Sequence, residues 1–175
     1  AFVEMSGTPA GSVAELGTNS DAVFVMVMNG VQAKAVILGD DGLAAHMPKG
    51  GAVILTATIK PSEARDIGAA LEGSGIHLID SPVSGGFPGA QGGTLTMMAA
   101  ATSEVLDQYK PIMGAVSKTI HRVGTRAGDG QVMKSCLQTL IGSIFGATFE
   151  AAALAAKAGV SGQALYDVFS TSGAS

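Results

Sequence analysis

The chain has 175 residues, of which 47% are hydrophobic and 14% charged, and its formal net charge is -4. This length fits one domain, or one domain and a small part of another. The negative charge and the lack of Lys/Arg runs interleaved with aromatic residues exclude a nucleic-acid-binding protein. Because charged residues are rarer than in an average soluble domain, we expect much of the surface to be covered by a partner chain or by protein outside this sequence.

The cysteine content and the termini indicate a cytoplasmic protein. Cys136 is the single cysteine, so no intramolecular disulfide can form, and no Cys/His pair has the spacing of a metal site. We expect its thiol to be a small buried apolar group. The opening residues "AFVEMSGTPAG" lack the features of a signal peptide. The most apolar long segment, residues 140–158, is interrupted by Glu150 and Lys157, so it predicts a buried helix and no membrane partner.

Strand and helix patterns alternate up to residue 80. The apolar runs predict strands over residues 22–28, 51–58 and 76–79, and the segments between them predict helices over residues 31–39 and 61–75. This β-α-β order is typical of a parallel sheet with both faces covered.

The second half of the chain changes in character near residues 124–128. Two further strands are predicted over residues 94–100 and 118–124, with a helix near residues 102–109 between them. A proline-free helix follows from about residue 130 to 158, and another begins near Ser161. A helix of this length spans roughly 43 Å, which is too long for a crossover in a compact α/β unit. We therefore predict an α/β domain over residues 1–125 and the start of an all-α domain over residues 126–175.

Three of the predicted strands end in segments with unusual chemistry. These segments are "MNG" at residues 28–30, "TATIKP" at residues 56–61 and "DSPVSGGFPGAQGGTL" at residues 80–95. Ligands of open α/β sheets bind at the carboxyl ends of the strands, so the three segments should face one crevice. Ser84 offers a hydroxyl, and Gly85 and Gly86 offer backbone N–H groups that a carboxylate could accept. Taken alone, the glycines are better explained by a tight turn that needs positive φ.

Lys134 is the candidate acid/base. It lies one turn into the long helix among apolar residues, so its amine should be partly removed from water, which lowers a lysine pKa. Gln138 is four residues further on and therefore on the same helix face. The alternative is a solvated lysine whose stem covers apolar surface, and alone it is the better explanation.

The remaining titratable side chains favour structural roles. We expect Asp80 to cap its own loop by accepting backbone N–H bonds. We interpret His46, His77 and His121 as structural or surface residues, because they are scattered through unlike segments with no paired carboxylate nearby in sequence.

Two of these motifs resemble those of a known family. "DSPVSGGFPGAQGGTLTMMAA" is similar to the substrate-binding signature of the β-hydroxyacid dehydrogenases, which include 3-hydroxyisobutyrate dehydrogenase, tartronate semialdehyde reductase, L-threonate dehydrogenase and, more distantly, 6-phosphogluconate dehydrogenase. "GDGQVMK" resembles the Gly-x-Gly-x-x-x-Lys segment of that family. The resemblance extends through "FVMVMNGVQAKAVILG" and "ILTATIKPSEAR", and so covers nearly the whole chain.

The resemblance implies an NAD- or NADP-dependent oxidoreductase acting on a small hydroxy acid. It assigns the substrate carboxylate to Ser84, Gly85 and Gly86, the acid/base role to Lys134, and a further substrate contact to Gln138. It also implies that the first domain is part of a Rossmann domain whose cofactor-binding residues here are Val27, Met28, Asn29, Thr58 and Gly128. The apolar long helix and the low charge suggest a homo-oligomer.

The chain departs from the family pattern in two ways. Gln138 stands where many members have asparagine, which resembles the L-threonate dehydrogenase branch and favours a sugar-acid substrate. No Gly-x-Gly-x-x-Gly turn precedes Ala22, and relatives continue beyond the last residues, so we expect a fragment. Two other functions stay open: a non-catalytic dehydrogenase-like module that binds a cofactor or a partner, and an imine reductase of the same architecture, although neither needs this lysine.

Overall fold

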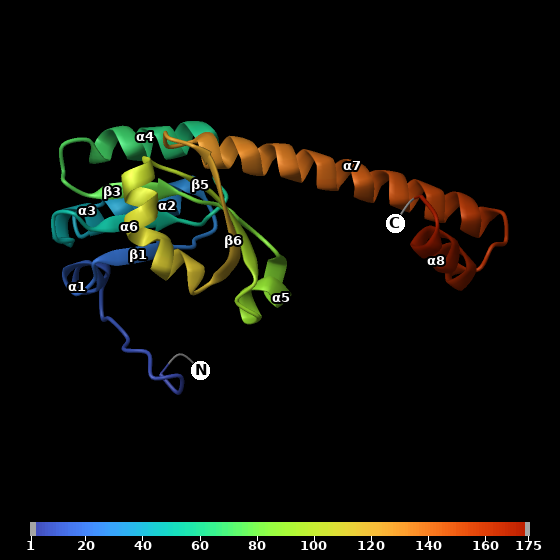
Figure 1. Ribbon diagram of the computed structural model, residues 1–175, viewed down its shortest axis with the longest axis horizontal. Helices are drawn as coiled ribbons and strands as arrows, with labels where there is room; N and C mark the ends of the chain where they lie inside the picture. Colours follow the sequence, from blue (N-terminus) through green and yellow to red (C-terminus); the bar gives the residue numbers. More distant parts are fainter. Residues whose placement is uncertain (1–2, 174–175) are drawn as a thin grey trace. The chain divides into compact units, whose positions relative to one another are not determined.

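The computed structural model describes residues 3–173, which divide into two compact units between Lys134 and Ser135. The first unit is a six-stranded sheet with helices on both faces (Figure 1). Its strands are β1 (Ala22–Val25), β2 (Ala52–Leu55), β3 (His77–Asp80), β4 (Val83–Ser84), β5 (Leu95–Ala100) and β6 (Ser117–Gly124).

The sheet is mixed. Strands β1, β2 and β3 run parallel in sequence order, and β5 pairs with β6 in parallel. The chain reverses after β3, so β5 is antiparallel to both β3 and β4. The predicted α/β class and parallel core are therefore confirmed, with an antiparallel step where the sequence analysis expected a continuous parallel sheet.

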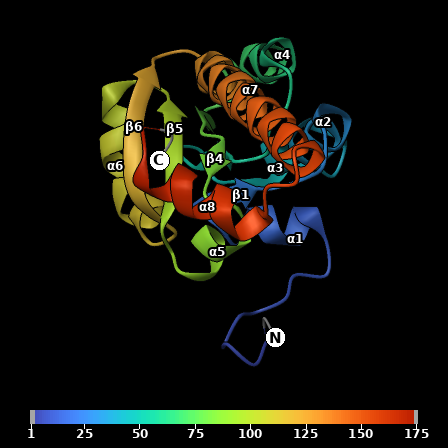
Figure 2. The same ribbon diagram turned by 90° about the vertical axis from the view of Figure 1, so that its right-hand side faces the viewer.

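Helices cover the two faces of the sheet through alternate strand residues. Val53 and Leu55 of β2 pack in one apolar cluster with α2 (Gly30–Leu38), α3 (Leu43–His46) and α4 (Pro61–Leu71). Ala52 and Ile54 point the other way, into a cluster with α6 (Ser103–Gly114). Figure 2 shows α6 on one side of the strands and α2 and α4 on the other. This two-sided burial explains why β2 is apolar at every position.

Strand ends and short helices differ from the sequence predictions. β1 and β2 are shorter than predicted because the N–H groups of Thr56 and Ala57 both turn to the carbonyl of Val25. The helix predicted to stop at residue 109 continues to Gly114 with Pro111 inside it. Helices α1 (Val13–Thr18) and α3 were not predicted at all.

The glycine-rich segment after β3 contains more regular secondary structure than predicted. It contains β4 and the short helix α5 (Gly86–Gln91). Gly85 and Gly86 have φ values of 132° and 59°, which turn the chain from the strand into the helix.

The second unit contains most of α7 (Asp129–Lys157) and all of α8 (Gly162–Thr171). The prediction that residues 140–158 form a buried helix is right about the helix and wrong about its burial. In the described chain only Gly130, Gln131 and Lys134 of α7 are buried, and Cys136 is exposed rather than buried. The reason is that, among the described residues, α8 is the only other helix in the second unit, so most of the α7 surface is left uncovered within that unit.

The close approach of α7 to the sheet predicts opposite effects for two glycines of this helix. A Cβ on Gly130 would lie 2.6 Å from the Met98 carbonyl oxygen and 2.7 Å from that of Asp80, whereas a Cβ on Gly142 meets nothing within 4 Å. We expect Gly130→Ala to destabilise the complete protein by about 1–3 kcal/mol through overpacking. Gly142→Ala should stabilise it by about 0.5–1 kcal/mol.

Denaturant unfolding of both variants measures the two effects. Equal stability of the two variants would contradict the packing of Gly130 against the sheet.

Candidate functional site

The end of β1 presents exposed apolar side chains beside a capped helix. The Asn29 side chain accepts a hydrogen bond from the Gln32 N–H at 2.9 Å and so caps α2, while the Met28 N–H donates to Gln32 Oε1 at 3.0 Å. Met28 is 84% exposed, and Met26 and Val31 are exposed as well. Of the three residues predicted to line a cofactor path here, Met28 and Asn29 are exposed and Val27 is half-buried.

The end of β2 presents Thr58 between two buried neighbours. Thr58 is exposed, and Ala57 and Ile59 on either side of it are buried. The Gln131 side chain bonds to both neighbours: its Oε1 accepts from the Ile59 N–H at 3.0 Å, and its Nε2 donates to the Ala57 carbonyl at 3.1 Å. The backbone of this loop is therefore fixed while the Thr58 side chain remains available to a ligand.

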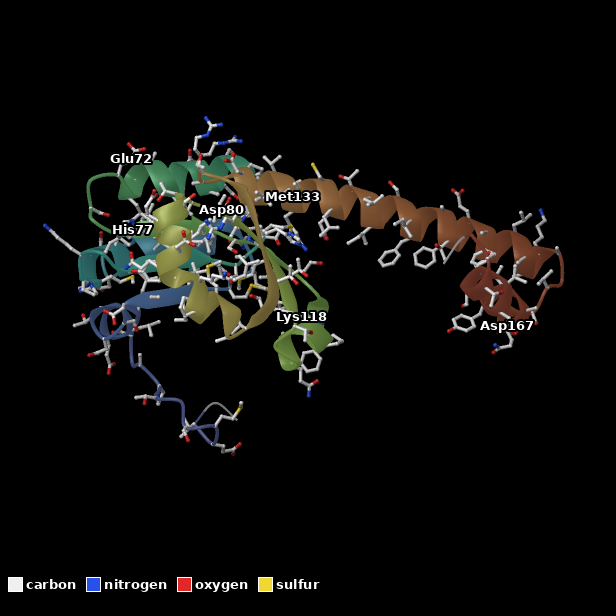
Figure 3. The ribbon with its side chains drawn as sticks, in the orientation of Figure 1. Glu72, His77, Asp80, Lys118, Met133 and Asp167 are labelled. Carbon is white, nitrogen blue, oxygen red and sulfur yellow. The ribbon has the colours of Figure 1, made fainter. Side chains whose placement is uncertain are left out.

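Asp80, the last residue of β3, holds the start of α7. Its Oδ2 accepts hydrogen bonds from the N–H groups of Gly128, Gly130 and Gln131 at 2.8, 3.0 and 3.3 Å, and its Oδ1 accepts from Gln131 Nε2 at 2.8 Å. Burial raises the pKa of Asp80, and these four hydrogen bonds oppose the rise. Figure 3 marks Asp80 below the first turn of α7.

The predicted role of Asp80 is thus half right. The carboxylate does accept backbone N–H bonds, but from the residues that open α7, some fifty positions away, rather than from its own loop. The physical reason is that a helix N-terminus offers several unpaired N–H groups and a positive dipole end to a buried anion.

Lys134 lies on the buried face of α7. It is 8% exposed, and with Gly130 and Gln131 it forms the buried part of the helix. Desolvation lowers its pKa, as the sequence predicted. A lysine amine in such surroundings reaches the neutral form at lower pH than an exposed one and is suited to proton transfer.

Ser84, Gly85 and Gly86 follow directly on the residues against which α7 packs. A Cβ on Gly130 would meet Pro82 Cδ at 2.9 Å, and Pro82 leads into β4, where Ser84 pairs with Thr96. Ser84 is half-buried, and both glycines are exposed. Lys134 is one turn beyond Gly130 on the same helix face, so the start of α7 ties the lysine to the segment that carries Ser84.

The remaining residues considered in the sequence analysis are Gly128, Gln138 and the three histidines. Gly128 is buried with φ of 94°, and a Cβ there would lie 2.8 Å from the Pro61 carbonyl oxygen. Gln138 belongs to the second unit and is exposed. His77 and His121 lie in β3 and β6, and His46 ends α3 with its Nε2 3.9 Å from Asp41 Oδ1. No group of three or more metal-ligating side chains occurs among residues 3–173.

Sequence reasoning missed Gln131. The residue is 1% exposed and joins the Thr58 loop, Asp80 and α7. The sequence does place Gln131 directly after a glycine at a helix start, on the same helix face as Lys134. The residues next to it in sequence do not show that its side chain bonds to residues 57 and 59.

Two family models match the chain. Residues 1–124 match the NAD binding domain of 6-phosphogluconate dehydrogenase, and residues 128–175 match the NAD-binding domain of NADP-dependent 3-hydroxyisobutyrate dehydrogenase. The chain belongs to the β-hydroxyacid dehydrogenase family. Both models describe domains that bind the nicotinamide cofactor the sequence analysis expected.

Similar proteins agree with this assignment. The chain is 37% identical to the L-threonate dehydrogenase of Cupriavidus necator over 98% of its own length and 58% of the relative. It is similar to the crystal structure of a 3-hydroxyisobutyrate dehydrogenase from Salmonella typhimurium, with 34% identity, a TM-score of 0.84, and coverage of 95% of this chain and 57% of that one. The chain thus spans less than two thirds of the length of these relatives.

A more distant likeness concerns the fold alone. An imine reductase from Myxococcus stipitatus superposes with a TM-score of 0.86 at 15% identity, covering 97% of this chain and 58% of that one. The architecture is therefore shared between dehydrogenases and imine reductases, and function has to be inferred from the site.

The buried carboxylate predicts a large effect of a small change. Asp80→Asn replaces one acceptor oxygen by an NH₂ group that must face either Gln131 Nε2 or the backbone donors of α7. We expect a loss of about 2–3 kcal/mol of stability in the complete protein. Chemical denaturation measures it.

Asp66→Asn is the matched control, because Asp66 pairs with Lys34 while both side chains are exposed. It should cost less than about 0.5 kcal/mol. Similar losses for the two variants would contradict the role of Asp80 as the anchor of α7.

Proposed function

We propose that the complete protein is an NAD(P)-dependent oxidoreductase that transfers a hydride between a nicotinamide and a small β-hydroxyacid, with Lys134 as general acid/base. The observation that carries the proposal is the burial of Lys134, a residue 8% exposed with a lowered pKa, one turn after Gly130, which packs against Pro82 just before Ser84. Membership of the dehydrogenase family supports the reaction class.

The chain's residues would handle one proton and one carboxylate. When bound, the nicotinamide supplies the hydride chemistry, and the protein aligns the reacting carbons. In oxidation the neutral Lys134 amine accepts the proton of the substrate hydroxyl. In reduction its ammonium form returns a proton to the carbonyl oxygen.

The substrate end of the site consists of Ser84, Gly85 and Gly86. The hydroxyl and the exposed backbone of the two glycines suit a carboxylate group, because positive φ aims successive N–H groups toward one anion. Gln138 adds an amide for a further hydroxyl of the substrate. The relatives named for L-threonate and 3-hydroxyisobutyrate support a sugar acid or a short hydroxy acid, with the threonate type favoured by Gln138.

The cofactor end consists of the loops after β1 and β2. The exposed side chains of Met26, Met28 and Val31 offer an apolar surface for a planar ring, and Thr58 offers a hydroxyl on a fixed backbone. Val27 and Asn29 belong to the same loop after β1. Gly128 contributes to the cofactor end of the site by letting α7 start close to α4. These residues fit the nicotinamide side, and the 175 residues hold no Gly-x-Gly-x-x-Gly turn for the pyrophosphate.

The alternatives differ in what they require of Lys134. A non-catalytic module, or an imine reductase of the same architecture, has no need of a buried lysine one turn above the Gly130 contact. Retention of that amine together with the Ser84 segment favours the hydroxyacid dehydrogenase.

Exposed apolar side chains on the second unit favour the assembly of several copies of the chain into an oligomer. Leu140, Ile144, Phe145 and Phe149 are exposed, and the two phenylalanine rings stack with centroids 6.1 Å apart. By length and composition α7 could cross a membrane. Its place within a dehydrogenase family model instead favours a cytoplasmic homo-oligomer in which this face is covered, with the domain boundary near residues 124–128. Sedimentation of the complete protein tests the assembly.

Removing the amine of Lys134 should abolish most turnover. We expect Lys134→Ala in the complete protein to lower kcat by about 10² to 10⁴, the usual contribution of a positioned acid/base. Lys118→Ala, at an exposed position in β6, is the control and should keep normal turnover. Steady-state kinetics measure both, and near-normal turnover of Lys134→Ala would refute the assignment.

The pH dependence gives a second test of Lys134. Because its pKa is lowered, kcat/KM for oxidation should rise with pH and level off below the ordinary lysine pKa, while reduction should show the opposite trend. The unfolded chain binds more protons between the two pKa values, so the buried amine destabilises the fold at neutral pH and this cost falls as pH rises. Lys134→Met should therefore be inactive yet at least as stable as the wild type.

Ser84 should affect substrate binding more than turnover of bound substrate. We expect Ser84→Ala to raise KM for the hydroxy acid by about tenfold, the effect of losing one hydrogen bond to a charged group. Titration of cofactor and substrate separately checks this. A change confined to cofactor affinity would show that Ser84 does not hold the carboxylate.

A further inference from the structure

Gln131 holds the backbone on both sides of Thr58 with one side chain. The distances are 3.0 Å from Oε1 to the Ile59 nitrogen and 3.1 Å from Nε2 to the Ala57 carbonyl oxygen. The amide is planar and carries one acceptor and one donor group, so it matches the C=O and N–H groups that flank a single residue, as a neighbouring strand would. This pairing determines the backbone conformation at Thr58 while leaving its side chain exposed.

The same amide is fixed from the other side. Nε2 also donates to Asp80 Oδ1 at 2.8 Å, and the Gln131 N–H donates to Asp80 Oδ2 at 3.3 Å. With Gln131 only 1% exposed, water cannot replace these partners. The side chain of Gln131 thus links the backbone of the Thr58 loop by hydrogen bonds to the Asp80 carboxylate, which anchors α7.

We propose that Gln131 is a positioning residue that sets the distance between the Thr58 loop and the Lys134 amine. It rests on the proposed function, in which Thr58 contacts the nicotinamide side of the cofactor and Lys134 the substrate. Gln131 is three residues before Lys134 in the same helix, so both side chains share one rigid segment. A cofactor held by the Thr58 loop is therefore placed relative to the amine by the Gln131 hydrogen bonds.

Other side chains of similar size do not satisfy this geometry. Methionine fills the same volume without a donor or an acceptor. Asparagine keeps the amide but is one methylene shorter, so it cannot reach Ala57, Ile59 and Asp80 together. These two replacements therefore separate the volume of Gln131 from its hydrogen bonds and its reach.

The test measures cofactor affinity and turnover of Gln131→Met and Gln131→Asn in the complete protein, with NAD and NADP as probes. We expect the cofactor Kd to rise by about tenfold, as the loss of one or two hydrogen bonds allows. We expect kcat to fall by about 10- to 100-fold because the reacting groups are misplaced. The Kd of the hydroxy acid should change little. Gln108→Met, at an exposed position of α6, is the matched control and should leave all three values unchanged.

The outcomes separate a positioning role from a merely structural one. The proposal is overturned if a folded variant has a lower Tm but keeps both the cofactor Kd and kcat within about twofold of the wild-type values. A change of about twofold is too small for the loss of a hydrogen bond. Should Gln131→Met fail to fold, Gln131→Asn alone decides the matter. A wild-type protein that binds neither NAD nor NADP would overturn the proposed function and this inference together, whereas normal wild-type binding with unaffected variants would overturn the inference alone.

Discussion

The site depends on one buried carboxylate at the end of β3. Asp80 is fully buried, and its two oxygens accept three backbone N–H groups at the start of α7 and the amide of Gln131. Leaving such a carboxylate without partners would be very costly, so α7 can begin only where its free N–H groups meet Asp80. The orientation of everything on the first turns of α7, including Lys134, follows from this constraint.

Small residues make the arrangement sterically possible. Gly130 lets α7 approach the carbonyl oxygens of Asp80 and Met98, and Gly128 has a positive φ close to Pro61 at the start of α4. The helix start is therefore packed against two strands and a neighbouring helix at once. A lysine one turn later is removed from water by this packing, and this desolvation lowers its pKa.

The sequence predicted most of the architecture because periodicity and turn residues are local signals. The strand patterns that became β1, β2, β3, β5 and β6 and the long proline-free helix were recognisable, whereas Lys134 alone was better explained as a solvated lysine and the structure shows it buried. The antiparallel step through β4 and the partners of Asp80 were not, because they depend on contacts about fifty residues apart in sequence. Gln131 was missed for the same reason, and the exposure of Cys136 depends on what covers α7, which composition does not specify.

In the function proposed for these residues, they serve hydride transfer to or from a hydroxy acid. The most direct measurement is the near-ultraviolet absorbance of the reduced nicotinamide while the complete protein is incubated with NAD or NADP and a panel containing L-threonate, 3-hydroxyisobutyrate and L-serine. We expect reduced cofactor with at least one of these acids, formed in proportion to the acid consumed. Binding of cofactor and acids without any reduction across the panel and across neutral to alkaline pH would contradict it.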